Sequence, residues 1–243
     1  MFTLGAPPEA ALILFIAVAI SAAVQRLAGQ GLGMIVAPIA ALIAPQHLPA
    51  TLLMIGLATG AGALSMDIRA VDWREAPWGM LGRALGAFAG AALAAALAGA
   101  EGFGIAVAVI ILAAIALTLS GLRIPITPAS LTGAGLTAGV MGTMTAVGAP
   151  PMAILYGREE AARSRAMQNL FFVWGMAWSL AALALFGLIG AHNLAMALLL
   201  APAVFVGLWA SRPAARRLQG RPILPFALGL SGLAALTLLA RSL

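Results

Sequence analysis

The sequence predicts an all-α fold, a polytopic transmembrane helical bundle of about eight to ten membrane elements. Hydrophobic residues make up 63% of the 243-residue chain and charged residues only 8%, far from the composition of a soluble globular domain. Uncharged runs of about 20 residues, the length that crosses a bilayer, recur along the chain. Few stretches alternate apolar and polar residues, which argues against a membrane β-barrel.

The first half of the chain supplies five of these elements. Its uncharged runs are 10–25, 27–66, 84–100 (extended back through Arg83 to about Trp73) and 102–122. The run 27–66 is long enough for two elements, and the first of them, 27–45, is short because it follows a glycine-rich break. Each of the other runs forms one span.

The second half repeats this arrangement. The run 124–157 fits one full span and one short piece, 166–211 fits two spans, and 222–240 fits one. A short element can cross fully or return as a re-entrant hairpin, and both readings stay open. The N-terminal "MFTLGAPPEA" has no basic residues, so we interpret the first apolar run as a retained helix and not as a cleaved signal.

Arginine sets the expected orientation. All 13 basic residues are arginine, the net charge is +6, and there is no cysteine that could form a disulfide. Most loop arginines fall on one side, which the positive-inside rule makes cytoplasmic: Arg69, Arg74, Arg123, Arg158, Arg163, Arg165, Arg212, Arg216, Arg217 and Arg221. Both termini are then periplasmic in a bacterial inner membrane, although Arg241 disagrees. His47 and His192 fall on outer loops, where we expect them to be solvated.

The chain resembles an inverted repeat of residues 1–125 and 126–243. The segment "GTMTAVGAPPMAIL" places a glycine, a proline and a leucine at the spacing of Gly29, Pro38 and Leu42. When the halves are aligned, arginine occurs in a loop of one half where the corresponding loop of the other lacks it. Halves that insert with opposite orientation explain this pattern.

Two breaks predict a binding site in the membrane. A helix can be interrupted in a bilayer only where its freed backbone groups face protein or a wet cavity. The first break, "AGQGLGMIVAP", contains Gln30, Gly31 and Gly33, and the second contains Gly148. Helices that begin at such breaks direct unpaired N–H groups toward an anion. Close packing of small residues is the alternative reading, and it is the one we favour for "GRALGAFAG".

Polar residues near the breaks are the other candidate ligands. Arg83 lies about ten residues after Trp73, hence about 15 Å along the helix and near mid-bilayer. No carboxylate is available there, so its natural partner is a bound anion, unless it snorkels or bonds to backbone carbonyls. The remaining candidates for substrate binding are Arg26, Thr143, Thr145, Gln168 and Asn169. Arg26 could instead mark a helix end, and the neutral groups could form helix–helix hydrogen bonds.

The residue types also exclude functions. There is no carboxylate in the spans for a proton or sodium site, so coupled pumping is disfavoured. An anion that leaves a cytoplasm held negative gains about 2.3 kcal/mol per charge per 100 mV, which is close to a fifty-fold gradient. The chain lacks H-E-x-x-H and G-x-S-x-G, so we expect no enzyme activity, no catalytic residues, no metal and no cofactor.

Several segments resemble those of the TauE/SafE sulfite exporter family of bacterial membrane permeases. They are "GLGMIVAP", "GAPPMAILYG", "DIRAVDWREA" before a glycine-periodic helix, and "RSRAMQNLFF" after the second break. The resemblance implies an inner-membrane transporter of sulfite, organosulfonates or related anions, frequently in the export direction. An anion channel, an uptake permease and a structural membrane subunit are the alternatives. The expected partners are the small anion, membrane lipid and, as an open alternative, a second copy of the chain, but no nucleic acid.

Overall fold

The computed structural model of the chain describes residues 7–29, 31–98, 102–217 and 224–242. This part consists of helices and connecting turns, without a strand, as predicted. The ten α-helices are α1 (Pro8–Ala28), α2 (Leu32–Ile43), α3 (Ala50–Asp67), α4 (Ala76–Ala96), α5 (Gly102–Leu119), α6 (Pro128–Thr145), α7 (Pro150–Tyr156), α8 (Ala161–Leu185), α9 (Ala191–Arg217) and α10 (Leu224–Ser242). Two 3-10 turns, η1 (Pro45–His47) and η2 (Ile68–Ala70), flank α3.

The chain is a multi-pass membrane protein. Six helices in the described part, α1, α3, α4, α5, α8 and α9, are long and apolar enough to cross a bilayer. Large apolar side chains point outward on the same helices, among them Leu12, Leu85, Leu198 and Phe205. The two elements predicted to be short are α2, with 12 residues, and α7, with 7. The predicted number and order of elements are therefore confirmed.

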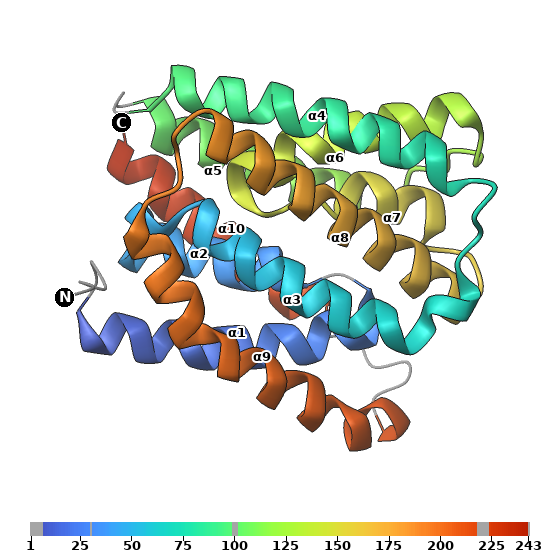
Figure 1. Ribbon diagram of the computed structural model, residues 1–243, viewed down its shortest axis with the longest axis horizontal. Coiled ribbons are helices and arrows are strands. Elements are labelled where there is room, and N and C mark those ends of the chain that lie inside the picture. Colours follow the sequence, from blue (N-terminus) through green and yellow to red (C-terminus); the bar gives the residue numbers. More distant parts are fainter. Residues whose placement is uncertain (1–6, 30, 99–101, 218–223, 243) are drawn as a thin grey trace.

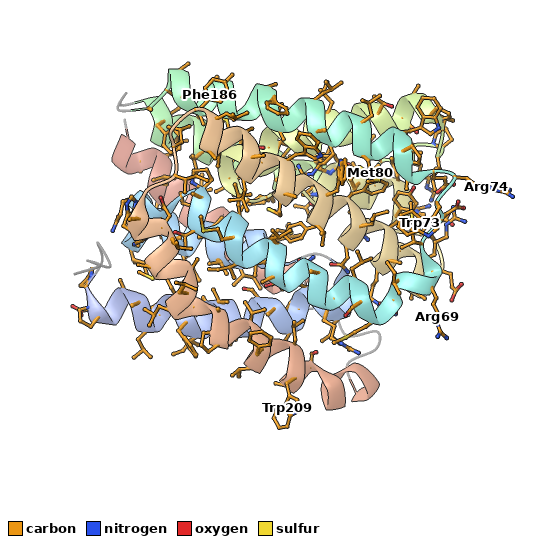
Figure 2. The ribbon with its side chains drawn as sticks, viewed as in Figure 1. Arg69, Trp73, Arg74, Met80, Phe186 and Trp209 are labelled. Carbon is orange, nitrogen blue, oxygen red and sulfur yellow. The ribbon has the colours of Figure 1, made fainter. Side chains whose placement is uncertain are left out.

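The long helices lie side by side and give the bundle two ends (Figure 1). Figure 2 shows Arg69, Trp73 and Arg74 at one end, which we name the arginine-rich end, and Phe186 at the opposite end. The helix α1 runs toward the arginine-rich end, and α2 returns from there (Figure 1). The first short element is therefore a hairpin partner of the helix before it.

Neutral side chains join the elements at the opposite end. Thr51 Oγ1 donates to the carbonyl of Asn193 (3.2 Å), and the rings of His47 and His192 lie 5.6 Å apart. The expectation that His47 is solvated is wrong, because its side chain is fully buried. The 3-10 turn η1 folds it inward against α9, a contact between residues about 145 positions apart that no local pattern reveals.

The contacts between helices follow the same pattern in the two halves. Each helix of the first half corresponds to the helix five places later in the chain, and corresponding pairs of helices are in contact. The packing of α9 on α1 is matched by α4 on α6, and that of α9 on α3 by α4 on α8. The pair α10 and α2 is matched by α5 and α7. The two halves thus interlock, since α4 packs mainly on helices of the second half and α9 on helices of the first.

Small residues make the closest of these contacts. Three glycines of α4, Gly82, Gly86 and Gly90, face the backbone of α6, so close that an added Cβ would collide with α6 atoms at all three positions. The packing interpretation of "GRALGAFAG" is confirmed. Because lipid offers no hydrophobic drive for helix association, this close approach supplies van der Waals contact instead. It also holds Arg83, between the first two glycines, against the second half.

Candidate functional site

The first break lies between α1 and α2. Gly29 ends α1 in the left-handed region with φ +74°, and Gly31 precedes α2 with φ +151°. The Gln25 side chain spans the break, because its Oε1 accepts a hydrogen bond from the Leu32 amide (3.2 Å) and its Nε2 donates to the Gly29 carbonyl (3.0 Å). The same Nε2 donates to Asn169 Oδ1 (2.9 Å), which ties the break to α8. Gln25 thus accepts a hydrogen bond from one of the backbone N–H groups at the start of α2 that have no partner within the helix.

The second break lies between α6 and α7. Ala146 ends α6 in the left-handed region with φ +60°, the non-glycine counterpart of Gly29. Thr145 Oγ1 accepts from the Val147 amide (3.1 Å) and donates to the Met141 carbonyl (2.7 Å). After three further residues Pro150 begins α7. Both segments predicted to be interrupted are therefore interrupted.

The two breaks meet inside the bundle. Gly33, in the first turn of α2, lies against the Ala146 carbonyl, where a Cβ on Gly33 would overlap the oxygen and carbon of that group. Both residues are buried. Segments more than 100 positions apart are thus brought into contact at the interruptions of their helices.

Arg83 lies beside the second break. It is the eighth residue of α4, and its side chain is 1% exposed. The helix begins at Ala76 and not near Trp73, which places Arg83 about 10 Å from the helix start instead of the predicted 15 Å. Its Nε donates to the Phe171 carbonyl of α8 (3.3 Å). In the described part of the chain, neither Nη1 nor Nη2 has a hydrogen-bond partner.

Three glycines make room for the guanidinium. A Cβ on Gly142 of α6 would lie 2.6 Å from Nη1, one on Gly148 of the second break 2.8 Å from both Nη atoms, and one on Gly175 of α8 nearer still to Nε. Gly148 was among the predicted site residues, but Gly142 and Gly175 were not. Only the placement of α4 between α6 and α8 brings them together, so their positions in sequence carry no such signal.

A small cavity of about 10 Å³ lies at this point. It is lined by Arg83, Gly148, Ala149, Met152, Gln168, Phe171 and Phe172. Its volume accommodates about one water molecule. Three of the predicted ligands, Arg83, Gly148 and Gln168, therefore line one enclosed space, and this space is smaller than an oxyanion.

The other described candidates do not line this cavity. Thr143 donates to the Gly139 carbonyl (2.8 Å) and shares a hydrogen bond with Ser179 (2.7 Å). Asn169 accepts a hydrogen bond from Gln25 at the first break, and Thr145 accepts one from the Val147 amide at the second. Gly31 and Gly33 lie at the start of α2. Arg26 lies toward the arginine-rich end, with Nε 2.6 Å from Met66 Sδ. Gln30 lies outside the described residues.

Ion pairs close the arginine-rich end. Arg163 of α8 binds Glu75 (2.8 Å), which also accepts a hydrogen bond from the Tyr156 hydroxyl of α7 (2.9 Å). Arg165 binds both carboxylate oxygens of Asp67 at the end of α3 (2.8 and 3.2 Å). We name these two groups the ionic clasp. It joins the start of α8 to the α3–α4 connection and to α7.

The described part of the chain holds no group of three or more His, Asp or Glu side chains that could bind a metal. The model of the family described as sulfite exporter TauE/SafE matches residues 13–238. Neither the curated proteins nor the solved structures give a significant match. The family match covers all ten helices in whole or in large part, including both breaks and Arg83. The chain therefore belongs to the TauE/SafE sulfite exporter family, whose members are membrane transporters and not enzymes.

Proposed function

We propose that the protein exports a small sulfur-containing anion, such as sulfite or an organosulfonate, and that the anion binds at Arg83. The observation that carries this proposal is the buried guanidinium at the cavity beside the second break, whose two Nη groups have no hydrogen-bond partner in the part of the chain that the structure describes. A buried cation that has no negatively charged partner is costly, and a bound anion removes that cost. Gly148 and Gln168 line the same cavity, so they complete the proposed binding set.

Residues 1–125 and 126–243 form inverted repeats in this proposal. The exchange of helix contacts between the halves supports it, as do the breaks at equivalent places in each half. Transporters built in this way bind substrate where interrupted helices of the two repeats meet. The contact of Gly33 with Ala146 lies at such a place. Substrate would then reach the site alternately from each side as one repeat moves against the other.

The described conformation fits an occluded state of this cycle. The cavity at Arg83 is too small for sulfite, so the surrounding helices must separate before an anion enters. At the arginine-rich end this requires the ionic clasp to open, and at the opposite end it requires the neutral contacts of Thr51 with Asn193 to separate. Ion pairs hold one end closed and neutral hydrogen bonds hold the other, so a substitution can weaken either end without affecting the opposite one.

Orientation and energetics favour export. We place the arginine-rich end in the cytoplasm of a bacterial cell and both termini in the periplasm, according to the positive-inside rule. No carboxylate lines the cavity, which leaves no evident proton or sodium site beside the substrate. The membrane potential then drives the anion outward by about 2.3 kcal/mol per charge per 100 mV. Uptake and channel activity are the competing functions.

Counterflow in proteoliposomes tests this proposal. Liposomes loaded with unlabelled sulfite should accumulate labelled sulfite transiently, since a carrier exchanges one anion for another. Arg83→Ala should abolish the exchange, whereas Arg74→Ala, a change at an exposed arginine on the connection before α4, should preserve it. Single-channel currents without counterflow would show that the protein acts as a channel and not as a carrier. Exchange that persists at the wild-type rate in Arg83→Ala would remove the proposed site.

A further inference from the structure

Three buried polar atoms that have no hydrogen-bond partner among the described residues belong to side chains that line the Arg83 cavity. They are Nη1 and Nη2 of Arg83 and Oε1 of Gln168. The two side chains are 1% and 5% exposed, and both line the cavity. A buried polar atom without a partner costs about 1–3 kcal/mol, so three such atoms around one space indicate that something else binds them.

The atom of Gln168 that has no hydrogen-bond partner in the described part of the chain is an acceptor. Gln168 Nε2 donates to Ser164 Oγ (2.9 Å), one turn earlier on α8, which leaves the amide oxygen as the atom without a partner. The other lining residues are Gly148, Ala149, Met152 and two phenylalanines, none of which has a charged or hydrogen-bonding side chain. The cavity therefore offers one positive charge, two donor nitrogens and one oxygen acceptor.

We propose that this site selects a monoanion that carries its own O–H or N–H donor. This inference rests on the anion site proposed above and adds to it the protonation state of the ligand. Two oxygens of the anion accept from Nη1 and Nη2, and its own hydrogen is donated to Gln168 Oε1. For sulfite, the matching species is hydrogensulfite and not the dianion, since a single guanidinium balances one negative charge.

An anion without a donor fits this arrangement poorly. It places an oxygen lone pair or a methyl group against Gln168 Oε1, and the buried acceptor stays unsatisfied. Sites that satisfy a ligand hydrogen in this way discriminate strongly against analogues that lack it. Gln168 is thus a specificity-determining residue, and Arg83 supplies the attraction for any small anion.

Sulfamate and methanesulfonate form a matched pair for the test. Both are monoanions with an SO₃ group and similar size, but only sulfamate carries N–H donors. Competition against labelled sulfite, measured on the purified protein, should give sulfamate an affinity about tenfold higher, the effect of one hydrogen bond. Gln168→Leu should remove this preference. Gln168→Met, which keeps much of the length of the side chain but removes the acceptor oxygen, should remove the preference as well, and it serves as the test if the leucine variant does not fold.

The outcomes separate this inference from the proposed function. Equal competition by the two anions in the wild-type protein, or a sulfamate preference that persists in Gln168→Leu or in Gln168→Met, would overturn the role of Gln168 and leave the anion site intact. If no small anion competes with sulfite and Arg83→Ala binds sulfite as the wild type does, the anion site itself is overturned. A preference for sulfamate that disappears in Gln168→Leu supports both the role of Gln168 and the anion site at Arg83.

Discussion

Replacement of Arg83 by methionine should make the protein more stable and less able to bind anions. The guanidinium is buried, and its one hydrogen bond in the described part of the chain, from Nε to the Phe171 carbonyl, is long at 3.3 Å. Removal of buried charge in favour of apolar side chains often stabilises a protein by about 1–4 kcal/mol. Methionine follows the aliphatic part of the arginine side chain and removes the two partnerless Nη groups. We therefore expect Arg83→Met to unfold at a higher temperature than the wild type.

The loss of binding can be worked from the same two groups. Each hydrogen bond to a charged group contributes about 1.5–3 kcal/mol. Loss of the bonds from Nη1 and Nη2 therefore costs about 3–6 kcal/mol, or about two to four orders of magnitude in Kd. In the wild type, sulfite at a hundred times its Kd should add about 2.7 kcal/mol of stability. In Arg83→Met, the same sulfite concentration should add almost none.

Thermal unfolding in detergent, with and without sulfite, measures both effects in one assay. Arg74→Met, at an exposed arginine, is the control and should keep the wild-type response to sulfite. A lower unfolding temperature for Arg83→Met would show that the guanidinium stabilises the fold, contrary to this reasoning. A sulfite shift of wild-type size in that variant would show that the anion binds elsewhere.

Two further predictions concern the breaks and the clasp. Gly33→Ala places a methyl group against a carbonyl of the second break and should lower the free energy of unfolding by at least about 1–3 kcal/mol. The control is Gly133→Ala, in open space on α6, which should be neutral or slightly stabilising. Urea or thermal unfolding compares the two variants, and equal stability would refute the contact. Asp67→Asn should weaken the ionic clasp by about 1 kcal/mol and raise the opening of the arginine-rich end about fivefold. Because the chain has no cysteine, Met152→Cys in the cavity can report this opening through its rate of thiol labelling. Arg74→Gln is the control for charge, and a labelling rate that Asp67→Asn leaves unchanged would contradict the proposed closure.

The elements and breaks could be predicted because they depend on local chemistry. Charge-free runs of bilayer length identify the helices, and glycine and proline mark the places where a helix stops. Gly29 and the short α2 follow this rule, as does α7 after Pro150. The prediction that Arg83 lies within a span without a carboxylate partner also followed from sequence, because every Asp and Glu falls in a loop or at the end of a span.

The surroundings of Arg83 could not be predicted because they come from three helices distant in sequence. Nothing in "VWGMAW" indicates that Gly175 accommodates a guanidinium until α8 is placed against α4. Gln25 is a similar case. Its amide caps the first break and binds Asn169, and no local pattern in the sequence indicates either contact. The pairing of Arg165 with Asp67 likewise joins residues near the ends of two helices, about 100 positions apart in the chain.

A structure determined with selenite, a heavier analogue of sulfite whose selenium can be located by anomalous scattering, tests the central claim most directly. The anion should lie within hydrogen-bonding distance of Arg83 Nη1 and Nη2, beside Gly148 and Gln168, in a cavity wider than the present 10 Å³. Selenium located only at arginines on the surface, with the Arg83 cavity still closed at saturating selenite, would contradict the claim that the transported anion binds at Arg83 beside the second break.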